Sequence, residues 1–172
     1  MRALGLGVTG YSFSMDLLAH YVRIHLTGAA AGIELFGRGS DLDDEDARQV
    51  AADIREELRE ERTWLLAFAD TIDAAEPVVA ETVAKIGEKV GRLKPNGDLL
   101  HRTPLTDVID LETMHDAVSG KVAGWEALLQ LDDEQVDRAD LERLLAQGHS
   151  QLDRLRTLHR SAARRAWDAR TA

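Results

Sequence analysis

Hydrophobic and polar residues recur along this chain with the period of an α-helix, and no stretch has the two-residue alternation of a strand. Glycines, prolines and capping residues divide the pattern into separate segments. The predicted helices cover residues 14–37, 43–72, 77–91, 106–131 and 140 to the C-terminus. Residues 92–104 contain two prolines and a Pro-Asn-Gly turn signal, and therefore predict a loop.

The order of these helices predicts an all-α fold. The first two long helices are expected to form one antiparallel hairpin, and the last two to form another across the acidic turn at residues 132–137. The long link between the hairpins predicts a four-helix bundle with ferritin-like connectivity and an extra short helix in the crossover. An up-down-up-down bundle with an added helix is the alternative. Residues 1–13 are expected to be a flexible lead-in and residues 14–172 a single domain.

Charge and composition exclude several classes of protein. The chain has 31 acidic and 21 basic residues and a net charge of −10, which disfavours binding to nucleic acid or anionic lipid. It has no cysteine, and therefore no disulfide, thiolate nucleophile or cysteine-ligated zinc. No segment has the roughly 18 apolar residues of a membrane span, and the start does not resemble a secretory signal. We expect a cytoplasmic protein.

Two glutamates stand where an amphipathic helix normally has apolar residues. At about 100° per residue, Glu57 and Glu61 fall on the same face as Ile54, Leu58 and Leu65. One or both should be buried. A buried carboxylate is tolerated only when a cation or hydrogen-bond donors compensate it. The expected partners are four basic residues of the crossover and the last helix: Arg92, Lys94, Arg102 and Arg156.

The same projection identifies a candidate metal site. Four ionisable residues are predicted to face inward: His25, Glu57, Glu61 and His159. If these side chains converge at one level of the bundle, their two carboxylates and two imidazoles would suit a divalent metal such as iron or manganese. A ferritin-like site normally uses Glu-x-x-His pairs, and the single pair in this chain, Glu112 and His115, is a second metal candidate. The preferred interpretation is an internal ion-pair network without a cofactor, and a site for a divalent metal is the alternative.

The first helix has more apolar surface than a bundle requires. Its apolar positions cover an arc of about 220°, whereas a surface helix needs little more than about 100°. We expect Leu17 and Ile24 to face the bundle, which leaves Phe36 for a second surface. Gly28 and Gly32 remove side-chain bulk and would let another helix approach. These three residues, Gly28, Gly32 and Phe36, therefore predict self-association, most simply as a homodimer.

Four stretches carry a resemblance to other proteins: YVRIHLTGAAAGIELF (21–36), GRLKPNG (91–97), TPLTDVIDLE (103–112) and SGKVAGWEALL (119–129). Through them the chain resembles a group of uncharacterised actinobacterial helical proteins. The resemblance implies a helical bundle and no particular activity.

No catalytic arrangement is recognised, because Ser119-Gly120-Lys121 lacks the upstream glycine of a phosphate loop. We expect a non-catalytic interaction or scaffold protein that self-associates. The main alternative is a ferritin-like protein that binds iron or manganese through a non-standard carboxylate and histidine site. A helical module that binds a small ligand or peptide beneath the crossover is a third hypothesis.

Overall fold

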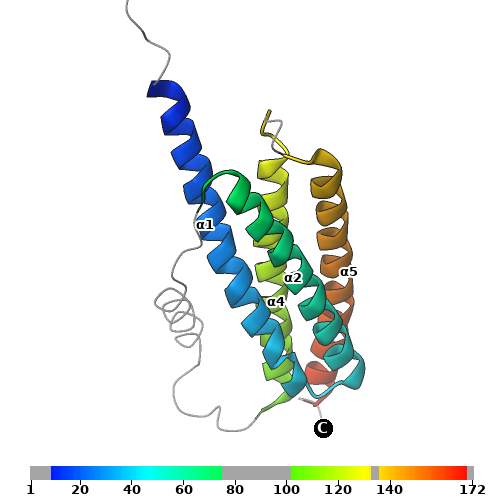
Figure 1. Ribbon diagram of the computed structural model, residues 1–172. Helices are drawn as coiled ribbons and strands as arrows, with labels where there is room; N and C mark the ends of the chain where they lie inside the picture. The colour runs from blue at the N-terminus through cyan, green and yellow to red at the C-terminus, as the bar shows by residue number, and fades with distance from the viewer. Residues whose placement is uncertain (1–8, 75–101, 133–135, 170–172) are drawn as a thin grey trace, which may run out of the picture.

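The computed structural model describes residues 9–74, 102–132 and 136–169. These residues form α1 (Thr9–Gly37), the short 3-10 helix η1 (Arg38–Asp41), α2 (Glu45–Thr71), α4 (Pro104–Leu128) and α5 (Arg138–Ala169). The predicted all-α fold is confirmed: α1 packs against α2, and α4 packs against α5 (Figure 1). The predicted short helix over residues 77–91 lies outside the described residues.

Local signals place most helix boundaries. The Asp44 side chain caps α2 by accepting a hydrogen bond from the backbone N–H of Ala47 at 3.0 Å. α4 begins at Pro104, slightly before the predicted start, because proline suits the first helical position, where no N–H partner is needed. α1 begins at Thr9, so residues 9–13 of the expected lead-in are helical.

The helices alternate in direction around the bundle. Figure 1 shows α1 and α5 running one way while α2 and α4 run the other. The end of α2 and the start of α4 therefore lie at opposite ends of the molecule. Among the described residues, no helix is long and apolar enough to cross a membrane.

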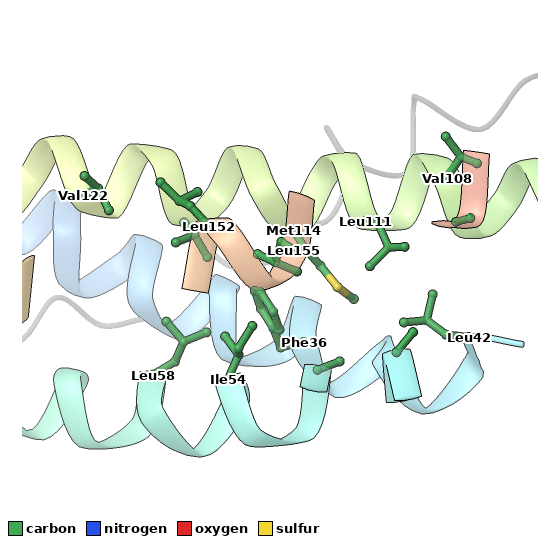
Figure 2. Packing of buried hydrophobic residues seen from close by; sticks show 14 of the residues in the cluster. Phe36, Leu42, Ile54, Leu58, Val108, Leu111, Met114, Val122, Leu152 and Leu155 are labelled. Carbon is green, nitrogen blue, oxygen red and sulfur yellow. The ribbon is translucent and has the colours of Figure 1, made fainter. Parts of the chain in front are cut away.

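The core consists of two clusters stacked along the bundle axis. Figure 2 shows the first, in which Ile54 and Leu58 of α2 point toward α4 with Phe36 of α1 beside them. The second cluster includes Val22 of α1, Leu65 of α2 and Trp125 of α4. Each fully buried apolar side chain contributes about 1.5–3 kcal/mol, so these clusters dominate the stability of the bundle.

The orientation predicted for α1 is wrong. Val22, Leu26 and Phe36 are buried in the bundle, whereas Leu17 and Ile24 are 57% and 54% exposed. The apolar arc of this helix is so wide that its periodicity does not select the buried face. Packing of α1 against α2 selects that face. Phe36 therefore belongs to the core of its own chain. Glu34 is exposed, as expected.

A buried carboxylate ties the two hairpins together. Asp107, in the first turn of α4, accepts a hydrogen bond from the backbone N–H of Asp43 at 3.0 Å. Arg102 donates to Asp107 at 2.6 Å and to Asp110 at 3.1 Å. Arg102 therefore pairs with acidic residues at the end of the bundle, away from Glu57 and Glu61.

Candidate functional site

Glu57 and Glu61 lie one turn apart on the inner face of α2. Glu61 is only 2% exposed, and the side chain of Glu57 is 24% exposed. The expectation that one or both glutamates are buried is therefore met by Glu61. Ile54, Leu58 and Leu65 surround the pair on the same helix face and are all buried.

An amide joins the two carboxylates. Gln151 of α5 is fully buried, and its Nε2 donates to Glu57 Oε2 at 2.8 Å and to Glu61 Oε1 at 2.9 Å. This residue is absent from the candidates that the sequence suggested. Gln151 follows Leu144 by seven residues and precedes Leu155 by four, so its place in the apolar stripe of α5 could have identified it.

Two cations complete the cluster. Lys121 Nζ of α4 donates to Glu61 Oε2 at 2.5 Å and also to Gln151 Oε1. Arg154 of α5 donates to both oxygens of Glu57, at 2.8 and 2.6 Å. We call these five residues, Glu57, Glu61, Lys121, Gln151 and Arg154, the polar cluster. Its two carboxylates balance its two cations.

Burial controls the titration of the central pair. Burial raises the pKa of the Glu61 carboxyl, and the charge and hydrogen bond of Lys121 oppose that rise. Burial lowers the pKa of Lys121, and Glu61 opposes that fall. Each pKa shift favours the neutral form of its group, so the cost of removing the two charges from water outweighs their mutual attraction.

The two predicted cations within the described residues have other partners. Arg102 pairs with Asp107 and Asp110, and Arg156 pairs with Asp153 on its own helix at 3.1 Å. Arg92 and Lys94 lie outside the described residues. Lys121 and Arg154 occupy the cation positions instead, because α4 and α5 bring them to the inner face of α2 at this level.

The four predicted metal ligands do not form a single group. His159 pairs with Glu112, with 3.0 Å between Nε2 and Oε1, on a partly exposed surface of α4 and α5. His115 lies beside Asp116, with Nδ1 and Oδ1 3.8 Å apart. Within residues 9–74, 102–132 and 136–169, no group of three or more histidine, aspartate or glutamate side chains is placed to hold a metal ion.

His25 occupies a notch made by a glycine. A Cβ added at Gly124 of α4 would lie 2.5 Å from Cε1 of His25, so the imidazole fits only because position 124 has no side chain. The ring also lies against Tyr21, with ring centroids 4.5 Å apart. Burial lowers the pKa of His25, which favours the neutral imidazole at pH 7.

A cavity of about 720 Å³ lies between α1, α2 and α4. A Cβ added at Gly28, Gly32 or Gly120 would meet nothing within 4 Å, so these glycines leave open space rather than a close helix contact. Leu65 and Trp125 provide apolar wall. The small-residue stripe that predicted self-association thus faces this cavity.

Polar groups from three helices reach the same cavity. His25 of α1, Glu61 of α2 and Lys121 of α4 all line it, and burial shifts the pKa of each. An apolar cavity with a few converging polar groups can orient a small molecule through hydrogen bonds while apolar walls hold the rest of it. Comparison with known protein families, with curated proteins and with solved structures finds no match for this chain.

Proposed function

We propose that this protein is a non-catalytic binding protein that holds a small, mainly apolar molecule in the cavity between α1, α2 and α4. The observation that carries the proposal is the cavity itself. Its volume of about 720 Å³ lies within the range of about 300–1,000 Å³ that is typical of ligand pockets. Its apolar walls and few polar groups match the usual composition of such sites.

The glycines of the wall support this function. Glycine inside a helix costs about 0.5–1 kcal/mol relative to alanine. Gly124 has a packing role, because it accommodates His25. At Gly28, Gly32 and Gly120 an added Cβ would have no neighbour within 4 Å, so these residues widen the cavity at a cost in helix stability. A bound molecule would use the space that they leave.

The polar cluster supports binding rather than catalysis. Glu61 and Lys121 hold each other at 2.5 Å, and Gln151 bonds to both, so neither charged group is available as a strong acid or base. The cluster keeps the cavity wall rigid and presents a balanced pair of charges. In this proposal the wall orients a ligand and leaves it chemically unchanged.

The direct test is binding of the neutral fluorescent probe N-phenyl-1-naphthylamine. We expect saturable binding to the wild type and its loss in Gly32→Leu and Gly120→Leu, whose side chains would fill the cavity. Ala123→Leu is the matched control, because Ala123 is exposed on α4 and does not line the cavity. Equal binding to the wild type and the glycine variants, or no binding to the wild type, would overturn the proposal.

Thermal unfolding of the same variants provides a second readout. Leucine favours a helix more than glycine does, and nothing lies within 4 Å of a Cβ at either position, so both glycine variants should be at least as stable as the wild type. A clear loss of stability would mean that another part of the chain already fills the cavity, and would argue against a ligand.

For the architecture, we propose the ferritin-like connection expected from the sequence. Its support is that α2 and α4 run in the same direction, so that the link joins opposite ends of the bundle (Figure 1). Membership of the actinobacterial helical group and a cytoplasmic location also stay proposals from the sequence.

Self-association is a second candidate function. Leu17, an exposed apolar side chain of α1 that does not line the cavity, is one that a second copy would cover. Phe36, being buried in its own chain, has no direct part in that contact. Binding of iron or manganese stays an alternative from the sequence, and the thermal stability of the protein with added metal distinguishes it.

A further inference from the structure

We propose that the ligand of this cavity is an uncharged single-chain amphiphile, with its tail toward Trp125 and its hydroxyl-bearing head toward Arg38. This inference rests on the proposed function and adds the chemical class and the orientation of the ligand. It follows from the shape of the cavity, from the distribution of polar groups along it, and from the balance of their charges.

The cavity is elongated along the bundle axis. His25 of α1 lies against Gly124 of α4 at one end of the cavity, and Gly39 of η1 lies close to Met114 of α4 at the other, so the first segment runs antiparallel to α4. On this side of the cavity the lining extends from Ile24 of α1 to Arg38 at the start of η1. At about 1.5 Å per residue, this stretch is roughly 20 Å long, which suits a chain-like molecule better than a compact one.

The two ends of the cavity differ in polarity. Near His25 the walls are apolar and come from Ile24, Leu65, Trp125 and Leu128. The opposite end contains the hydrophilic and largely exposed part of the lining: Glu34, Arg38, Thr113 and Asp116. An amphiphile would bury its tail at the apolar end, because apolar surface gains about 25 cal/mol per Å² on leaving water.

The charges that line the cavity cancel. Three are negative and three are positive: Glu34, Glu61, Asp116, Arg38, Arg62 and Lys121. An anionic or cationic head would add an unbalanced charge to a lining whose own charges cancel. A hydroxyl can donate to a carboxylate and accept from a cation, and it adds no net charge.

Displacement of the bound probe tests the ligand class. Decan-1-ol, decanoate and decylammonium share one tail and differ in the charge of the head, and each is used below its micelle concentration. We expect decan-1-ol to displace N-phenyl-1-naphthylamine at a concentration about tenfold lower, or more, than either ion requires. Equal or better displacement by decanoate or by decylammonium would overturn the inference.

Quenching of tryptophan fluorescence tests the orientation. Trp64 and Trp125 are in contact, with ring centroids 5.7 Å apart, whereas Trp167 is exposed on α5. In a Trp167→Phe variant, 10-bromodecan-1-ol should quench most of the emission, because bromine at the end of the tail would lie near Trp125. Decan-1-ol is the control. Quenching no greater than that of decan-1-ol would overturn the proposed orientation.

The two proposals fail in different ways. Probe binding that the glycine variants abolish, combined with no preference for the alcohol, would refute the ligand class and leave the binding function standing. Probe binding that does not depend on Gly32 and Gly120 would refute both.

Discussion

Replacing Lys121 with methionine is the sharpest perturbation of the polar cluster. Methionine retains most of the side-chain length but removes the ammonium group that bonds to Glu61 at 2.5 Å. Glu61 is 2% exposed, so the carboxylate would stay buried with only Gln151 as a hydrogen-bond donor. Removing one partner of a buried ion pair costs about 3–5 kcal/mol, and we expect Lys121→Met to lose that much stability at pH 7.

The loss should depend on pH in a defined direction. Burial already raises the pKa of Glu61 above 4.5, and removal of Lys121 takes away the charge that opposes the rise. A carboxyl whose pKa is higher in the folded state loses stability as the pH rises from 4.5 through its folded pKa. The deficit of Lys121→Met relative to the wild type should therefore be small near pH 4.5 and complete at neutral pH.

Urea unfolding followed by circular dichroism at both pH values measures this deficit. The matched control is Arg156→Met, because Arg156 pairs with Asp153 at the surface, with side chains 51% and 76% exposed, and such a pair is worth at most about 1 kcal/mol. The double variant Lys121→Met/Glu61→Gln should recover most of the stability, because no charge stays buried. Equal losses for Lys121→Met and Arg156→Met at pH 7, or a deficit that does not shrink on acidification, would refute the reasoning.

Three further outcomes are expected. Manganese or ferrous iron should leave the thermal midpoint of the wild type unchanged, because ion pairs already satisfy the inward carboxylates; a rise that Glu61→Gln abolishes would establish the metal site instead. Sedimentation at micromolar concentration should find a dimer that Leu17→Asp dissociates, since Leu17 is an exposed apolar residue of α1 that does not line the cavity; a wild-type monomer would contradict this. Gly39→Ala should destabilise the protein by about 1–3 kcal/mol, because its Cβ would lie 2.4 Å from that of Ala51. Gly120→Ala should stabilise it by about 0.5–1 kcal/mol, and changes in unfolding free energy of the same sign for the two variants would contradict this packing.

Much of the fold could be predicted from the sequence because helices depend on local interactions. The cap at Asp44 acts within a few residues of itself, so it marks a helix start in any tertiary context. Pro104 is the first residue of α4, whereas the pattern placed it in the preceding loop and predicted a start at residue 106. Periodicity likewise located Glu61 on an inner face, because α2 has one narrow apolar stripe and that stripe faces the core.

The partners of Glu61 depended on the tertiary structure. Lys121 is 60 residues away along the chain and Gln151 is 90, and each meets the carboxylate only because α4 and α5 come together at the inner face of α2. Helical periodicity places a residue on a face, but it does not say which residue of another helix lies at the same level. From the sequence, several long basic side chains were therefore equally suitable partners for Glu61, among them Arg102 and Arg156. The packing of the helices gives these two residues other partners.

The role of the small residues was also decided by packing. The sequence alone determined that Gly28 and Gly32 leave α1 without bulk on one side, and it determined nothing about what lies opposite. In the bundle α4 lies opposite these glycines, and its own Gly120 is equally small, so at this level the two helices border a cavity instead of packing closely. A missing side chain permits either arrangement, and only the separation of the helices, set by the core residues around them, selects one.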